Sequence, residues 1–217
     1  HSINYELYEL HKKAIITKSK DANGEVFIPT YISYKNEKYE IIKIEEEAFA
    51  NSKIEILSFS IDSAVLIIGN AAFENSSLKK LIIPKSLQKL NNLWCKGADK
   101  LNEIEVDSKN NFFSIKDDFL IYEDDKSKSK EILFSPREIS GEYSVPEGIT
   151  RIGNYSFSNR ERITSVKSSS STLDLISSYS FYKCDNLESL AFDQNNQLSL
   201  GKFCFSNSEK LSTIDIQ

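Results

Sequence analysis

Apolar residues recur along most of this sequence at one fixed spacing. A phenylalanine that follows a small residue or cysteine marks five repeats, and these anchors stand at Phe49, Phe73, Phe157, Phe181 and Phe205. The successive gaps between them are 24, 84, 24 and 24 residues. Self-similarity at a period of about 20–50 residues is typical of solenoids and other repeat architectures. The pattern therefore predicts stacked coils of about 24 residues each.

Two further apolar elements accompany each anchor. Five or six residues after it comes a pattern of the type L-x-x-L-x-I, such as Leu78, Leu81 and Ile83, and before it stands an apolar pair such as Ile67-Ile68. Strand side chains point alternately to opposite faces, so these spacings predict a strand on either side of the anchor. A glycine often follows the apolar pair, where we expect it to let the backbone turn. One coil thus consists of strand, turn, aromatic plug, turn and strand.

A single coil cannot bury its own apolar side, so the anchors are expected to form the core of the stack. Cys95 lies 22 residues after Phe73 and takes the same place in its repeat, which gives six repeats in all. Cysteine packs as a small hydrophobic residue. The predicted core column consists of Phe49, Phe73, Cys95, Phe157, Phe181 and Phe205.

The period breaks between the third and fourth repeats. Apolar runs at 119–122 and 132–134 flank a polar tract, which predicts an inserted β-hairpin. The front of the chain shows two apolar runs, at 14–17 and 26–28, which predict a hairpin that caps the stack.

The resulting prediction is a mainly β leucine-rich-repeat solenoid of about six coils, with an N-terminal cap and an inserted hairpin. We expect one continuous domain that extends beyond Gln217, since the last residues read as an interrupted strand. Its last coil should then be partly uncovered at Leu211, Ile214 and Ile216 and should favour self-association. The expected segments are a cap at 1–40, repeats at 41–107, the insertion at 108–148 and repeats at 149–217.

Composition narrows the possible functions. The net charge of −5 and the lack of a basic stretch without counter-charges argue against nucleic acid as a partner. No apolar run approaches the roughly 20 residues of a membrane span, so we expect no membrane insertion. The three cysteines show no C-x-x-C motif, and neither a metal site nor any other cofactor is indicated. Two sequons, at Asn75 and Asn154, could accept glycans in a secretory pathway.

Catalytic chemistry is poorly represented. The chain has two histidines, His1 and His11, and both lie at the front. A nucleophile in the serine run 168–171 could meet His11 only if the chain folded back across several coils. We therefore expect a binding protein and not an enzyme.

The repeat itself resembles a known family. Ile68-Gly69 through Ala72-Phe73 to Leu78, Leu81 and Ile83-Pro84 closely match the pattern of the BspA-like, or Treponema-type, leucine-rich repeats, whose unit reads Ile-Gly-x-x-Ala-Phe-x-x-Cys-x-x-Leu-x-x-Ile-x-Ile-Pro. Residues 181–190 preserve the cysteine of that pattern at Cys184, although most other repeats lack it. The resemblance spans nearly the whole chain.

The resemblance implies a function in binding. Members of this family are typically surface or secreted proteins that adhere to host proteins, host cells or other microbes. For this chain it implies an adhesin-like module that contacts proteins or glycans at the cell surface or after secretion. The alternative is an intracellular scaffold for protein–protein interaction, which three unpaired cysteines would suit.

Candidate binding residues are those that point outward from the strand after each anchor, because this row varies while the frame stays fixed. Tyr31, Tyr34 and Tyr39 near the cap are expected to be exposed and form an alternative contact patch. The candidates on the outward face are Glu55, Ser58, Lys79, Lys80, Glu103, Glu105, Lys167, Glu188 and Asp215.

Overall fold

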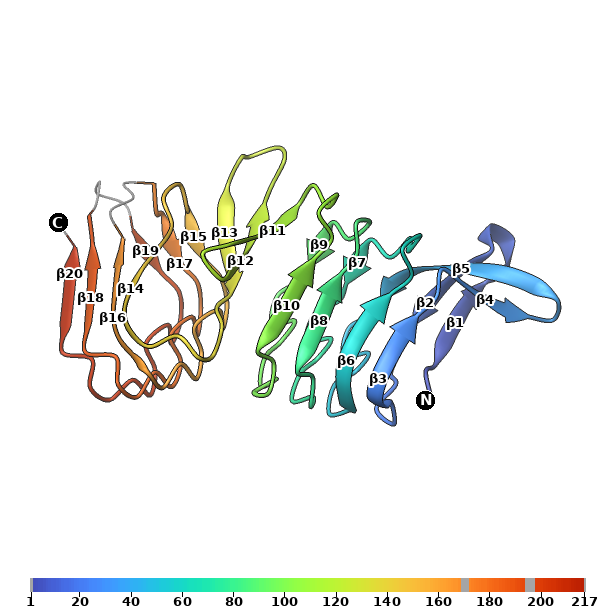
Figure 1. Cartoon of the computed structure of the whole chain (residues 1–217), viewed down its shortest axis with the longest axis horizontal. Coiled ribbons are helices and arrows are strands. Elements are labelled where there is room, and N and C mark those ends of the chain that lie inside the picture. Colours follow the sequence, from blue (N-terminus) through green and yellow to red (C-terminus); the bar gives the residue numbers. More distant parts are fainter. Residues whose placement is uncertain (1, 169–171, 194–197, 217) are drawn as a thin grey trace. The chain divides into compact units, whose positions relative to one another are not determined.

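The computed structural model describes residues 2–168, 172–193 and 198–216 of the chain. The chain divides into two compact units, unit 1 at 1–112 and unit 2 at 113–217. Each unit is a stack of coils whose strands run side by side in two sheets (Figure 1). The described residues contain no α-helix and one 3-10 turn, Glu9–His11. The predicted β-solenoid of leucine-rich repeats is thereby confirmed.

Unit 1 contains two sheets. The first has six strands in the order β1-β2-β5-β7-β9, with β4 paired to β5. Its strands are β1 (Tyr5–Tyr8), β2 (Lys13–Ile16), β4 (Tyr31–Tyr34), β5 (Glu37–Ile44), β7 (Ile67–Ile68) and β9 (Lys89–Leu90). The second sheet has the order β10-β8-β6-β3 and is wholly parallel. Its strands are β3 (Asn23–Ile28), β6 (Lys53–Phe59), β8 (Lys80–Ile83) and β10 (Glu103–Val106).

Unit 2 repeats this plan. One sheet has the order β11-β12-β13-β15-β17-β19, and the other, wholly parallel, has the order β14-β16-β18-β20. The first consists of β11 (Phe113–Lys116), β12 (Phe119–Glu123), β13 (Lys130–Phe134), β15 (Arg151–Ile152), β17 (Leu175–Ile176) and β19 (Ser199–Leu200). The second consists of β14 (Gly141–Ser144), β16 (Ile163–Ser168), β18 (Ser189–Phe192) and β20 (Thr213–Ile216).

The number of coils differs from the sequence-based prediction. Each four-stranded parallel sheet contributes one strand per coil, so each unit has four coils and the chain has about eight. The two additional coils are β2 with β3, which we expected in the cap, and β13 with β14, which we expected in the insertion. The predicted hairpin of β12 and β13 is present and antiparallel, yet β13 also pairs in parallel with β15 and so begins the coils of unit 2.

The front of the chain also differs from the predicted hairpin. The runs at 14–17 and 26–28 do not pair with each other, because β2 and β3 lie in opposite sheets and each pairs in parallel with the next coil. Their apolar side chains, such as Ile16 and Ile28, are fully buried inside this coil. The antiparallel strands at this end are instead β1, which pairs with β2, and β4, which pairs with β5. Alternating apolar residues fit either pairing, so the pattern alone could not distinguish them.

The anchor rings stack from coil to coil inside each unit. In unit 1 the Phe49 and Phe73 rings are nearly parallel, with centroids 5.9 Å apart. In unit 2 the Phe157 and Phe181 centroids are 4.9 Å apart, and Phe119 from β12 meets Phe157 at 5.4 Å. All five rings are fully buried, whereas Phe205 in the last coil is only partly buried.

Cys95 is a departure from the predicted column. Its backbone keeps the anchor register, since the Phe73 amide donates to the Trp94 carbonyl as the Phe49 amide does to that of Ala72. The Trp94 side chain is the one that packs edge-on against Phe73, with centroids 6.3 Å apart, while Cys95 is partly exposed. An indole fills the volume beside Phe73 far better than a thiol, so the neighbouring residue takes the interior place.

The plug turns share one backbone conformation. In each repeat the residues two before and two after the anchor position adopt positive φ, as Glu47 and Asn51 do at 54° and 58°. Asparagine and glycine favour this region, which explains why Asn51, Asn75, Asn159 and Asn207 follow four of the anchors.

The glycine that follows the apolar pair is needed for a different reason from the one expected. At Gly69 an added Cβ would lie 2.5 Å from the Glu45 backbone, so the neighbouring coil leaves no room for it.

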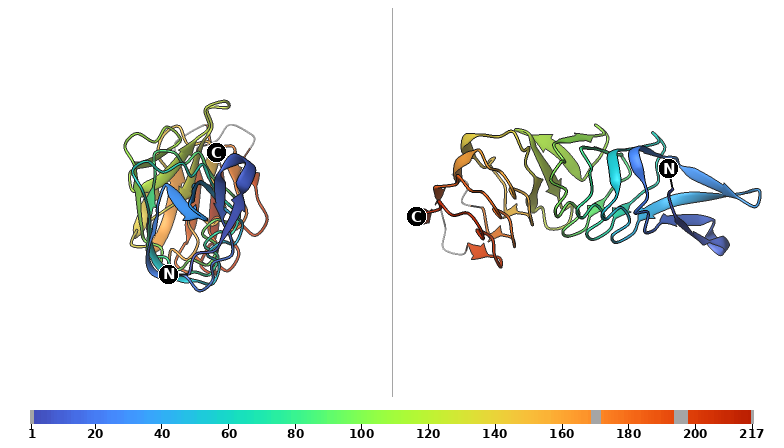
Figure 2. Two further views of the ribbon diagram at one scale, coloured as in Figure 1. Left: turned by 90° about the vertical axis from the view of Figure 1, so that its right-hand side faces the viewer. Right: turned by 90° about the horizontal axis from the view of Figure 1, so that it is seen from below.

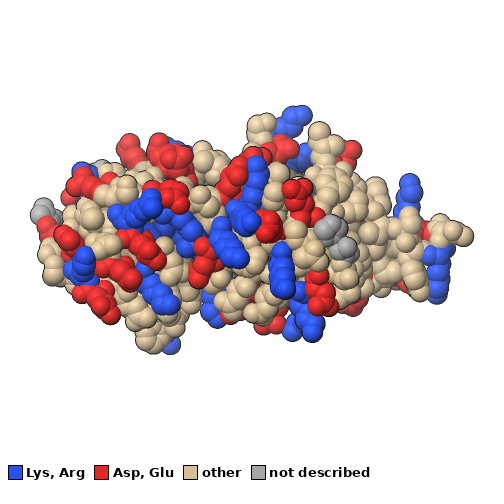
Figure 3. Space-filling view, turned by 60° about the horizontal axis from the view of Figure 1, so that its bottom comes forward, with Lys and Arg blue, Asp and Glu red and all other residues tan. Residues whose placement is uncertain are grey.

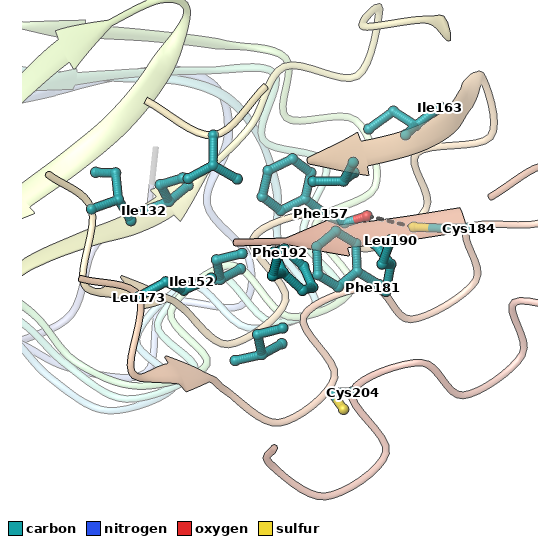
Figure 4. Close-up of a cluster of buried hydrophobic side chains, with 14 of the residues drawn as sticks. Ile132, Ile152, Phe157, Ile163, Leu173, Phe181, Cys184, Leu190, Phe192 and Cys204 are labelled. Carbon is teal, nitrogen blue, oxygen red and sulfur yellow. Dashed lines mark hydrogen bonds between the residues drawn. The ribbon is translucent and has the colours of Figure 1, made fainter. Parts of the chain in front are cut away.

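The position three residues after each anchor, here called the slot, is always buried. Cys184 occupies it in unit 2 and its thiol donates to the Phe157 carbonyl of the preceding coil at 2.9 Å (Figure 4). Ser208 makes the same bond to the Phe181 carbonyl at 2.7 Å. Burial raises the pKa of the Cys184 thiol to about 11, so it remains protonated at neutral pH. The slot residues are Ser52, Ser76, Ala98, Arg160, Cys184 and Ser208.

The last coil of unit 2 exposes apolar surface. Phe203 is 61% exposed and Ile214 is 45% exposed, and Leu211 is only partly buried. The side chain of Ile216, which we also expected to be uncovered, lies outside the described residues, as do His1 and the serines at 169–171. Strand β20 pairs with β18 on one side.

Candidate functional site

The outward face of the parallel sheet in unit 1 carries two ordered rows of side chains. Strand pairing places Glu25, Ile56, Lys80 and Glu103 in one row. In the next row it pairs Phe27 with Ser58 and Ile82 with Glu105, and the register of β6 and β8 aligns these two pairs. The residues between them, such as Leu57 and Leu81, point inward and are fully buried. Each coil therefore adds one side chain to each row at a fixed place. Phe27 places a ring on this face that is 59% exposed.

Ion pairs cross this face from coil to coil. The Lys80 ammonium lies 2.6 Å from the Glu103 carboxylate and 2.5 Å from that of Glu105. The hydrogen bonds that the Lys80 ammonium donates to these carboxylates raise the pKa of Lys80, and the bond to Glu105 lowers the pKa of that carboxyl. One coil away, Lys79 pairs with Glu55 at 3.0 Å. The charged groups thus hold one another in defined positions on the face.

The corresponding face of unit 2 carries smaller side chains than the face of unit 1. Its rows are Glu142, Ser165, Ser189 and Thr213, then Ser144, Lys167, Ala191 and Asp215. Lys167 pairs with Glu142 across the two strands. Hydroxyl groups and one methyl group make up most of this surface, and neither row includes an aromatic ring.

The nine candidate residues therefore fall into two groups. Glu55, Ser58, Lys79, Lys80, Glu103 and Glu105 belong to the face of unit 1, and Lys167, Glu188 and Asp215 belong to unit 2. Glu188 precedes β18 and is exposed, and its carbonyl accepts a bond from the Ser212 amide at 3.0 Å.

The candidates chosen from the sequence do not include Glu25, Phe27 and Glu142, because their strands were assigned to the cap and the insertion and not to the outward faces. The signal was present, since Val26-Phe27-Ile28-Pro29 and Tyr143-Ser144-Val145-Pro146 both resemble the end of a repeat.

The tyrosines near the front behave differently from one another. Tyr31 and Tyr34 on β4 are 49% and 46% exposed, as expected. Tyr39 on β5 is 1% exposed, which corrects the expectation that all three form a surface patch. Tyr39 lies on the same inward side of β5 as Ile41, and its hydroxyl donates to the Glu37 carboxylate at 3.0 Å.

Other kinds of site find no support in the part of the chain that the structure describes. Within it, no group of three or more His, Cys, Asp or Glu side chains could hold a metal ion. No helix among these residues is long and apolar enough to cross a membrane. Acidic and basic side chains are intermingled over the face shown in Figure 3, without a broad patch of one sign. The mixture does not suit an extended polyanion such as nucleic acid.

A second candidate site is a polar hollow at the plug turns of unit 2. It encloses about 700 Å³ and crosses three successive coils. Its lining is entirely polar or charged, and equivalent positions recur in it 24 residues apart. We call it the polar groove, and it is lined by Asn159, Glu161, Lys183, Asp185, Asn186, Asn207, Glu209 and Lys210.

Comparisons with known proteins agree with this architecture. The family model of the BspA type leucine rich repeat region matches in six copies, over residues 25–124 and 130–217. None of the curated proteins matches the sequence significantly.

Solved structures of bacterial leucine-rich repeat proteins are similar in fold. One from Eubacterium ventriosum is 20% identical with a TM-score of 0.65, and the match covers 100% of this chain and 70% of that one. The leucine rich repeat protein of T. pallidum is 17% identical with a TM-score of 0.56, covering 97% and 88% respectively. A leucine rich cell surface protein from Faecalibacterium prausnitzii is 14% identical, covering 100% and 93%, with a TM-score of 0.42 that is too low to support an argument.

The repeat pattern, the coil geometry and the family match all point to one assignment. The chain belongs to the BspA-type leucine-rich repeat family, whose members are generally non-enzymatic binding scaffolds.

Proposed function

We propose that this protein is a binding module of the cell surface or of the secreted space, and that it contacts a protein ligand through the outward sheet face of unit 1. The observation that carries the proposal is the row of Phe27, Ser58, Ile82 and Glu105, which begins with an exposed ring on β3, contains an aliphatic side chain two strands away on β8 and ends with a charged group on β10. Contact sites that dominate binding energy are rich in aromatic anchors surrounded by polar groups. Because the sheet is rigid, little conformational entropy is lost when a partner binds.

The charge network supports the same face. Lys80, Glu103 and Glu105 are already paired, so a partner would meet an ordered arrangement of charges on β8 and β10, at one end of the two rows. Such charges set orientation and association rate more than affinity. The family assignment supports a surface location, since members are typically displayed or secreted. The face of unit 2 offers fewer large side chains and is the weaker candidate for a protein ligand.

The test is binding of the purified chain to an array of extracellular matrix proteins and host-cell surfaces. Phe27→Ser removes the exposed ring, and Ile61→Ser is the matched control, since Ile61 is 79% exposed but lies in the loop after β6. We expect Phe27→Ser to weaken binding at least tenfold, which corresponds to about 1.4 kcal/mol. Ile61→Ser should leave it unchanged.

Two outcomes would contradict the proposal. Equal binding by the Phe27→Ser variant and the unsubstituted chain would remove the face of unit 1 as the contact. Failure to bind any extracellular ligand, combined with capture of cytoplasmic partners, would favour the intracellular scaffold. Cysteines that form no disulfide, such as the buried Cys184 and Cys204, suit a reducing compartment as well.

A further inference from the structure

We infer that the polar groove of unit 2 is a binding site for a neutral oligosaccharide. This goes beyond the proposed function, which concerns a protein ligand on the sheet face of unit 1. The groove lies at the plug turns, apart from the strand positions that form the outward face of unit 2.

The groove is held rigid by bonds between successive coils. The Asn159 amide donates to the Tyr182 carbonyl at 2.8 Å, and the Lys183 amide donates to the Ser206 carbonyl at 3.0 Å. Asn159, Lys183 and Asn207 also share the positive φ of the plug turn, at 56°, 56° and 58°. Equivalent side chains from the three coils are therefore presented side by side at a fixed spacing, as a preorganised site requires.

Its acidic groups differ from several of those on the sheet faces. On the sheet faces, Glu55, Glu103 and Glu142 each pair with a lysine of a neighbouring coil. Within the described part of the chain, no salt bridge joins a lysine or arginine to Glu161, Asp185 or Glu209. These carboxylates stand at equivalent positions of the three coils, and all three are exposed. They keep their hydrogen-bonding capacity for a ligand.

Donors lie among these acceptors. The Lys210 ammonium donates to the side-chain oxygen of Asn186 at 2.6 Å, and the Asn186 amide nitrogen donates to the Glu161 carbonyl at 2.6 Å. The Lys183 ammonium lies 5.3 Å from the centre of the Tyr182 ring, which holds it beside the groove. Tyr182 itself is fixed by edge contacts with the rings of Tyr155 and Tyr179.

This composition selects a class of ligand. A carboxylate can accept from two neighbouring hydroxyl groups, while an amide or ammonium donates to hydroxyl oxygens, so the groove matches the paired hydroxyls of a sugar ring. The lining contains no apolar side chain that would anchor a peptide. Three carboxylates against two ammonium groups also disfavour sulfated or sialylated chains. A neutral oligosaccharide is the ligand that fits best.

The experiment is binding of the full chain to an array of neutral, sialylated and sulfated oligosaccharides, followed by titration calorimetry with the strongest neutral ligand. Asp185→Asn keeps the shape of the central side chain and removes its charge, and Glu147→Gln is the control, an exposed carboxylate of unit 2 outside the groove. We expect Asp185→Asn to weaken binding at least tenfold and Glu147→Gln to have no effect. Melting temperatures equal to that of the unsubstituted chain would show that both variants fold.

Several results would overturn the inference. These are the absence of binding to neutral oligosaccharides, a preference for sulfated ones, or full binding by Asp185→Asn. If Asp185→Asn fails to fold, Glu209→Gln, at the exposed edge of the same groove, replaces it with the same expected loss. The Phe27→Ser variant separates this site from the proposed protein-binding face, since it should bind the oligosaccharide normally.

Discussion

Unit 1 and unit 2 are built from the same coil, yet they fill its buried slot with different chemistry. In unit 1 the slot holds Ser52, Ser76 and Ala98, and the two serine hydroxyls are buried without a hydrogen-bond partner. In unit 2, Cys184 and Ser208 donate to anchor carbonyls of the preceding coil. The comparison shows that stacking depends on the backbone ladder and the anchor rings, while side-chain bonds in the slot are an addition that one unit has and the other lacks.

Arg160 is the most unusual slot residue. Its side chain is 1% exposed, and its guanidinium donates to the carbonyl of Ser135 in the preceding coil and to that of Ser158 in its own. The same group lies 4.9 Å from the centre of the Phe134 ring. A buried charge is tolerated only when its donors are satisfied, and here the turn carbonyls satisfy them.

The largest expected effects concern the anchor columns. Phe73→Ala in unit 1 and Phe181→Ala in unit 2 should each lower the free energy of unfolding by about 3–5 kcal/mol, because each leaves a cavity in a packed stack. Hydrogen exchange measured peptide by peptide would show where protection is lost. If the units unfold separately, each substitution loosens its own unit alone. Equal loss in both units would instead support the single continuous solenoid that the sequence predicts.

The next effect in size concerns Arg160. Arg160→Ser gives unit 2 the slot residue of unit 1, and it leaves the carbonyls of Ser135 and Ser158 without this donor. We expect a loss of about 2–4 kcal/mol, since each buried carbonyl left unsatisfied costs about 1–3 kcal/mol and some water can enter. Urea denaturation measures it. A change below about 0.5 kcal/mol would mean that the guanidinium contributes nothing net in this slot.

The smallest effect distinguishes the two serine environments. Ser208→Ala removes the donor to the Phe181 carbonyl and the acceptor for the Cys184 amide, so it should destabilise unit 2 by about 1 kcal/mol. Ser76→Ala removes a buried hydroxyl that has no partner, and it should be neutral or slightly stabilising. Thermal unfolding of both variants makes the comparison. Equal losses would show that the hydroxyl of Ser76 also forms a stabilising bond.

The ends of the units differ as well. Strand β1 adds an antiparallel pair to β2 of the first coil of unit 1, and β4 adds one to β5 of the second. The inner residues of β2, Ala14 and Ile16, are fully buried. The last coil of unit 2 leaves Leu200, Phe203 and Ile214 between 45% and 61% exposed. A coil is complete only when another layer packs on it, because its apolar side has no other place to be buried.

The sequence by itself determined the repeat, the strands around each anchor, the hairpin at β12 and β13, and the family. It could do so because every coil must bury the same side, so a 24-residue period fixes the register of Phe49, Phe73, Phe157 and Phe181. The two coils that the sequence did not predict also contain the apolar pattern that ends in proline, at Pro29 and Pro146, although the match to the repeat is weaker there.

Only the tertiary structure decided which neighbour fills a given volume and which side chains meet across coils. Trp94 and not Cys95 packs on Phe73, because the space beside that ring suits an indole. Glu103 and Glu105 converge on Lys80, and Glu161, Asp185 and Glu209 line one groove, although each set comes from different coils. Periodicity specifies the backbone of the stack, whereas packing volume and charge pairing depend on distances between side chains that no single coil contains.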